Sequence, residues 1–135
     1  MNRADFFAVA ALGLACRLTA IATAQPPEQK TAAPQRPALM EVVGCLAEGP
    51  GGVWNLINGS EPIVATAPYT TEAALKEAAS RSLGTERYRL LGVGPFSAEQ
   101  HKGQKVAVKG LLIKDSKDNR LNVTSLQMVA SDCTK

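Results

Sequence analysis

The chain has 135 residues, of which 45% are hydrophobic and only 4% aromatic, and its formal net charge is +3. The scarcity of aromatic side chains argues against a protein that holds nucleic acid by stacking on its bases. The length is enough for one compact domain and too small for two, once an export signal is set aside.

Residues 1–24 have the form of a secretory signal peptide. Arg3 precedes a mostly apolar stretch, and the small-x-small triplet 22–24 predicts cleavage after Ala24. Arg17 limits the apolar run to about half of the roughly 20 residues that a membrane-spanning helix needs. We therefore expect an exported protein, periplasmic or extracellular, with no transmembrane span in the mature chain. An uncleaved anchor and a cytosolic helix are the weaker alternatives.

Cys16 raises the separate possibility of a lipid anchor. The sequence Gly-Leu-Ala-Cys that ends there distantly resembles the lipobox of bacterial lipoproteins. Cleavage at that point would leave the apolar stretch 18–24 in the mature protein. Lipidation is therefore the less favoured interpretation, and we expect this cysteine to be removed with the signal.

Residues 25–38 are rich in Pro, Gln, Ala and Thr and contain few large apolar side chains. Such a segment cannot bury enough surface to offset the entropy of ordering it, so we interpret it as a flexible linker. The folded domain is expected to span residues 39–135.

Cys45 and Cys133 are the two cysteines that remain after cleavage. An even number of cysteines in an exported chain favours a disulfide between them. Closing a loop of nearly 90 residues stabilises a fold by about 4 to 5 kcal/mol in the chain-entropy model. Free reactive thiols and metal ligands are the alternatives.

Short β-type segments separated by turn signals predict a mainly β fold. We expect strands at 40–47, 53–57, 87–93, 105–113 and 120–129, with a short edge segment at 62–66.

Several positions between and within these strands predict turns or irregularities. Asn58-Gly59 is typical of a tight turn. Gly110 indicates a bend, and a change of apolar parity in the last strand predicts a bulge near Thr124-Ser125. Residues 97–101 are expected to form one helical turn.

One helix is expected at residues 71–83. Thr70 or Thr71 is suited to cap its start, and Gly84 to stop it. Its apolar stripe is thin, so it should cover a sheet edge or a barrel end. Two ion pairs at i,i+4 spacing are expected on its surface: Glu72 with Lys76, and Glu77 with Arg81.

Residues 42–133 resemble small exported bacterial domains related to the OB-fold, a largely uncharacterised family. The resemblance is carried by Gly44-Cys45 on the first strand, a Tyr-x-Leu strand at 88–90, the pattern h-x-G-x-x-V-x-V-x-G at 101–110, and the final Cys133. It implies a small OB-like barrel of five or six strands with one inserted helix. The expected disulfide would close this barrel by joining its terminal strands.

No residue pattern of high specificity indicates an enzyme, a metal site or a cofactor. His101 is the only histidine, it precedes a glycine-terminated turn, and no acidic residue lies at ligand spacing from it. The glycine clusters 49–52 and 92–94 lack the strand, lysine and helix context of a phosphate-binding loop. The chain is therefore expected to be non-catalytic and to use no nucleotide cofactor.

The function we expect is a binding or accessory module of the bacterial cell envelope, acting as a monomer on an unknown envelope protein or polymeric ligand. OB-like barrels often bind oligonucleotides or oligosaccharides on a sheet face, and residues 100–135 carry seven basic against three acidic side chains. A structural protein-interaction module with an exposed apolar edge is the alternative. The candidate ligand face is built from aromatic and basic residues: Trp54, Tyr88, Lys105, Lys109 and Arg120.

Overall fold

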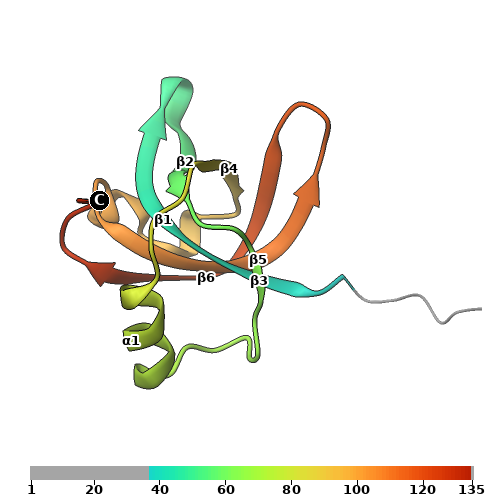
Figure 1. The fold of residues 1–135 in the computed structure, drawn as a ribbon. Helices are drawn as coiled ribbons and strands as arrows, with labels where there is room; N and C mark the ends of the chain where they lie inside the picture. Colours follow the sequence, from blue (N-terminus) through green and yellow to red (C-terminus); the bar gives the residue numbers. More distant parts are fainter. Residues whose placement is uncertain (1–36, 135) are drawn as a thin grey trace, which may run out of the picture. The chain divides into compact units, whose positions relative to one another are not determined.

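The computed structural model describes residues 37–134, so the predicted signal peptide, most of the predicted linker and Cys16 lie outside the described residues. The described part is mainly β, with strands and an α-helix (Figure 1). It has a six-stranded sheet, one α-helix and a disulfide between Cys45 and Cys133. Within residues 37–134, no helix has the length and apolar character needed to cross a membrane.

The strands follow the predicted segments closely and are mostly longer by one to three residues. They are β1 (Leu39–Gly49), β2 (Val53–Gly59), β3 (Ile63–Val64), β4 (Glu86–Leu91), β5 (Lys105–Lys114) and β6 (Asn119–Ala130). The helix α1 (Glu72–Ser80) lies between β3 and β4, and three short 3₁₀ turns are η1 (Pro50–Gly52), η2 (Gly94–Phe96) and η3 (Ala98–His101). The predicted edge segment is β3, and the predicted helical turn is η3.

The sheet has the strand order β2-β4-β6-β5-β1-β3, and β1 makes an additional pairing with β2. β1 is a long, curved strand (Figure 1) that pairs with β5 from Leu39 to Cys45 and with β2 from Cys45 to Gly49. β4 and β6 are parallel, and the remaining pairs are antiparallel.

The bulge predicted in the last strand is present. Between the pairs Lys109–Ser125 and Gly110–Val123, Thr124 has no partner on β5. The extra residue shifts the alternation of side chains by one position, so the apolar residues on both sides of the bulge face the same core. A side chain at Gly110 would collide with the backbone of β6.

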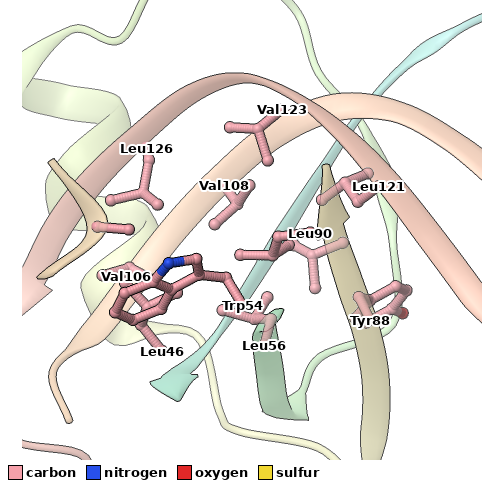
Figure 2. Close-up of a cluster of buried hydrophobic side chains, with 12 residues drawn as sticks. Leu46, Trp54, Leu56, Tyr88, Leu90, Val106, Val108, Leu121, Val123 and Leu126 are labelled. Atoms are coloured by element: carbon pink, nitrogen blue, oxygen red, sulfur yellow. The ribbon is translucent and has the colours of Figure 1, made fainter. Parts of the chain in front are cut away.

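The main core lies on one face of the sheet, which we call the core face (Figure 2). Its buried residues come from β1, β2, β4, β5, β6 and η3: Val42, Leu46, Trp54, Leu56, Tyr88, Leu90, Ala98, Val106, Val108, Leu121, Val123 and Leu126. A smaller cluster lies on the opposite, outer face, where α1 packs on β5 and β6: Val43, Ala78, Ala107, Leu83 and Val129. The inserted helix thus covers part of the outer face.

The start of α1 was predicted correctly, but its end was not. The Thr71 hydroxyl accepts a hydrogen bond of 3.2 Å from the Ala74 backbone N–H, which is an N-terminal cap. The helix ends at Ser80, so Gly84 does not terminate it. Gly84 lies instead against the backbone of Gly59, where a side chain would not fit.

One of the two predicted helix ion pairs forms. The Lys76 ammonium lies 2.9 Å from the Glu72 carboxylate. The Arg81 guanidinium pairs with the Glu41 carboxylate of β1, at 2.9 Å, and not with Glu77. The prediction of a Glu77–Arg81 pair is wrong, because Arg81 lies beyond the last helical turn and pairs with a residue of the sheet. Arg81 therefore links the inserted segment to β1.

The Asn58-Gly59 dipeptide does not form a tight turn. Asn58 has a positive φ of 50°, but Gly59 still belongs to β2, and the pairing of β2 with β4 is irregular between Leu56 and Gly59. The dipeptide therefore makes a strand irregularity, after which the chain continues into the 60–85 insertion.

The predicted disulfide is confirmed. Cys45 on β1 and Cys133 just after β6 have Cα atoms 5.7 Å apart, within the usual range for a disulfide. The bond closes a sequence separation of 88 residues and joins the first strand to the segment that follows the last.

Candidate functional site

The two aromatic residues of the predicted ligand face lie in the core (Figure 2). Trp54 is 8% exposed and Tyr88 is 1% exposed, and both belong to the main core cluster. The Tyr88 hydroxyl donates a hydrogen bond of 3.0 Å to the Ser60 carbonyl. Neither ring is therefore available to stack on a ligand.

Lys109 is buried beneath the inserted segment. It is 4% exposed, and its Nζ donates hydrogen bonds to the backbone carbonyls of Ala67 at 2.9 Å and Tyr69 at 2.8 Å. The Glu41 carboxylate lies 3.6 Å from the same Nζ. This lysine holds the insertion against the outer face of β5 and β1, and its charge does not reach solvent.

Lys105 has a similar role at the end of α1. Its Nζ donates to the Ala79 carbonyl at 2.8 Å and to the Arg81 carbonyl at 2.7 Å. The last carbonyls of a helix have no partner within the helix, and a cation near them also interacts favourably with the helix dipole. Lys105 therefore caps the C-terminal end of α1 from a neighbouring strand.

Arg120 lies on β6 and is partly exposed. Its guanidinium lies 3.3 Å from Asp115 and 3.7 Å from Asp118, both in the loop between β5 and β6. In the strand register it is the neighbour of Arg89 on β4. The five residues predicted as a ligand face thus do not form one exposed face. Trp54, Tyr88 and Lys109 are buried, while Lys105 and Arg120 are partly exposed and each is engaged by other groups of the protein.

A hollow of about 540 Å³ lies beside Arg89 on the outer face, and we call it the first hollow. On β4, Arg87 and Arg89 alternate with buried Tyr88 and Leu90, so the two arginines point outward. β2 contributes its outward-facing residues in the same way, and the loops before β2 and β6 close the ends. The lining residues are Pro50, Val53, Asn55, Glu86, Arg87, Arg89, Lys117, Asp118 and Asn119.

The charges in the first hollow are only partly compensated. Glu86 accepts a hydrogen bond of 3.4 Å from the Asn119 amide, and Asp118 lies beside Arg120. Within the part of the chain that the structure describes, Arg87, Arg89 and Lys117 are exposed and form no ion pair or side-chain hydrogen bond. Three cations that form no ion pair among the described residues therefore line a hollow that also holds the carboxylates of Glu86 and Asp118.

The first hollow offers cations, carboxylates and amides, which bind ligands by charge and hydrogen bonding. His101 does not line the first hollow, and its Nδ1 is 2.9 Å from the Gln104 side-chain oxygen in the loop before β5. Among residues 37–134, no group of three or more His, Cys, Asp or Glu side chains could hold a metal ion.

Comparison with protein-family models, curated proteins and solved structures finds no match to this chain. The resemblance of residues 42–133 to OB-fold domains therefore stays a prediction.

One pattern in the sequence indicates the arginines of the first hollow. The triplet Arg87-Tyr88-Arg89 alternates basic and aromatic residues in a β-type segment. If Tyr88 faces a core, both arginines face away from it. Lys117 gave no such signal, because a lysine in a polar loop is ordinarily only solvated.

Proposed function

We propose that this protein is a non-catalytic, exported binding module of the bacterial cell envelope, and that its first hollow binds a negatively charged ligand. The observation that carries the proposal is a set of three exposed cations that have no ion pair or side-chain hydrogen bond within residues 37–134: Arg87, Arg89 and Lys117. Arginine presents a planar fork of donors that fits carboxylate, phosphate and sulfate groups. A ligand with such groups would satisfy these side chains.

We further propose that the fold is an OB-like barrel. What supports it is the pairing of strands, which runs β1–β2–β4–β6–β5 and returns to β1, with β4 and β6 parallel. OB-folds bind ligands on the face of their second and third strands, between the loops that join strands 1 to 2 and 4 to 5. The first hollow lies on β2 and β4, between the 50–52 turn and the 115–118 loop.

The expected binding is electrostatic and sensitive to salt. No aromatic side chain lines the first hollow, so stacking adds nothing to affinity. Exposed charges are screened over about 10 Å at 0.1 M ionic strength. We therefore expect measurable affinity for polyanions at low salt and a steep loss as the salt concentration rises.

The test compares two variants that each remove two positive charges. Arg87→Ala with Arg89→Ala changes the first hollow, whereas Lys76→Ala with Lys102→Ala changes exposed side chains elsewhere. Binding of fluorescent polyphosphate and of polyuronate is measured by anisotropy, with neutral dextran as the negative probe. We expect the arginine pair to weaken binding about tenfold, equivalent to about 1.4 kcal/mol, and the lysine pair to have little effect. Equal losses in both variants would show that only net charge matters.

The second candidate function is a structural protein-interaction module. It is favoured by three exposed apolar side chains in the insertion, since Ile63, Val64 and Tyr69 are 43%, 64% and 68% exposed. Exposed apolar side chains that gather into a patch mark interaction sites, and these three all belong to the 60–85 segment. If Val64→Ser abolishes capture of an envelope partner while the arginine variant leaves it intact, this function is the better one.

A further inference from the structure

The first hollow is the first of three neighbouring hollows. A second hollow of about 380 Å³ is lined by Glu61, Pro62, Glu86, Tyr88, Lys114 and Asn119. A third of about 400 Å³ is lined by Pro37, Ala38, Met40, Pro62, Leu112 and Lys114. The first and second share Glu86 and Asn119, and the second and third share Pro62 and Lys114. The three hollows therefore adjoin one another in a row, and we call this row the groove.

Strand register explains the path of the groove. Tyr88 and Lys114 are both register partners of Asn119, so these three residues lie side by side where β4 and β6 begin and β5 ends. The hydrogen bond from the Asn119 amide to Glu86 forms the saddle between the first and second hollows. From there the groove continues to the point where residues 37–38 enter β1.

The chemistry of the groove changes along its length. The first hollow carries free cations, while the second carries the carboxylates of Glu61 and Glu86 with the Lys114 ammonium. Burial, with the charges of Glu86 and Glu61 adding to it, raises the pKa of Tyr88 to about 12, which agrees with both carboxylates facing this hollow. The third hollow is lined mainly by apolar side chains and the Lys114 stem.

This order of chemistry discriminates between classes of ligand. The second hollow holds two carboxylates, Glu61 and Glu86, against the single ammonium of Lys114. A uniform polyanion would therefore be attracted by the first hollow and repelled by the second, because like charges at close range disfavour binding. A polypeptide can place an acidic, a basic and an apolar side chain in succession.

We propose that the groove binds an extended polypeptide segment of a partner protein, with acidic residues in the first hollow, a basic residue in the second and apolar residues in the third. This inference rests on the proposed function and names the ligand class. The carboxylate of an acidic residue pairs with Arg87 and Arg89, and the ammonium or guanidinium of the basic residue pairs with Glu61. Pro62 and Met40 contact the apolar residues.

The experiment uses labelled peptides of about twelve residues and the purified full chain, with affinity measured by anisotropy. One peptide has acidic, basic and apolar blocks in that order, one has the reverse order, and one has the same composition scrambled. We expect one of the two ordered peptides to bind at least tenfold more tightly than the scrambled one. Equal affinity of all three would overturn the inference.

A charge reversal tests the second hollow directly. Glu61→Lys should weaken the preferred peptide at least fivefold and should favour a peptide whose basic block is made acidic. Glu72→Lys reverses the same charge on the exposed surface of α1 and should change neither affinity. Thermal unfolding of both variants confirms that each is folded.

The outcomes separate this inference from the proposed function. If polyphosphate binding depends on Arg87 and Arg89 but Glu61→Lys leaves peptide binding unchanged, the anion site stands and the polypeptide ligand is refuted. If Glu61→Lys strengthens polyphosphate binding beyond that of any peptide, the ligand is a polyanion. If neither probe depends on the two arginines, the proposed function fails as well.

Discussion

Replacement of Lys109 by methionine tests whether this lysine holds the 60–85 insertion onto the sheet. Methionine keeps a long unbranched side chain of similar length and removes the charge and the donors. Two backbone carbonyls of the insertion then lose the ammonium that they share, and Glu41 loses one of its two cationic partners. Glu41 keeps the other partner, Arg81, at 2.9 Å.

The magnitude follows from these contacts. A hydrogen bond that involves a charged group contributes about 1.5 to 3 kcal/mol, and removing one partner of a buried ion pair costs about 3 to 5 kcal/mol. Because Glu41 remains paired and the insertion can partly rehydrate its carbonyls, we expect a loss near 3 kcal/mol. Urea unfolding followed by the fluorescence of buried Trp54 should show a midpoint lower by about 1 to 3 M.

Lys102→Met is the matched control. Lys102 also pairs with one glutamate, Glu48, at 2.8 Å, but its side chain is 57% exposed. Exposed pairs contribute about 0.2 to 1 kcal/mol, so the control should stay within 1 kcal/mol of the unmodified protein. If Lys109→Met were no more destabilising than the control and instead lowered ligand affinity, Lys109 would belong to a ligand face, and the structural role argued for it would be wrong.

Two further predictions concern the disulfide and Tyr88. The double variant Cys45→Ala with Cys133→Ala should lower the free energy of unfolding by about 4 to 5 kcal/mol, because a bridge across 88 residues restricts the unfolded chain; a loss below about 1 kcal/mol in urea unfolding would contradict the chain-entropy account. Tyr88 has a folded-state pKa of about 12 against an ordinary value of 10.0, so its contribution to stability is fully present below pH 10. Relative to Tyr88→Phe, the protein should lose up to about 1.4 kcal/mol per pH unit between pH 10 and 12, and parallel pH profiles of the two proteins would refute the shift.

β1 and β5 are buried over several consecutive residues, and their β-type residues between turn signals indicated them. β4 and the first part of β6 could be predicted because they alternate buried and exposed side chains with a period of two. The bulge at Thr124 was predictable for the same reason, since apolar residues change parity within a single segment. The end of α1 was not predictable in this way. Lys105 of β5 donates to the carbonyls of Ala79 and Arg81, and this contact comes from a residue more than 20 positions away in the chain.

The candidate site was missed for a related physical reason. Lys109 on β5 and Arg89 on β4 are both basic residues that alternate with buried apolar ones. The local sequence pattern is therefore the same for both and does not predict which of them is exposed. The insertion covers the outer face at β5 and leaves the outer face at β4 open. Which strand keeps its cations exposed depends on that packing, and a strand's own sequence does not encode it.

The position of the insertion thus decides where the protein presents positive charge. The chain from 100 to 135 is the most basic third by composition, yet two of its lysines, Lys105 and Lys109, donate to backbone carbonyls of the insertion. Arg87 and Arg89 come from a part of the chain with slightly more acidic than basic residues, and they remain free. Because a charge used to satisfy buried carbonyls is not available to a ligand, the position of exposed positive charge follows from which cations the fold leaves unpaired, and the density of basic residues along the sequence is a poor guide to it.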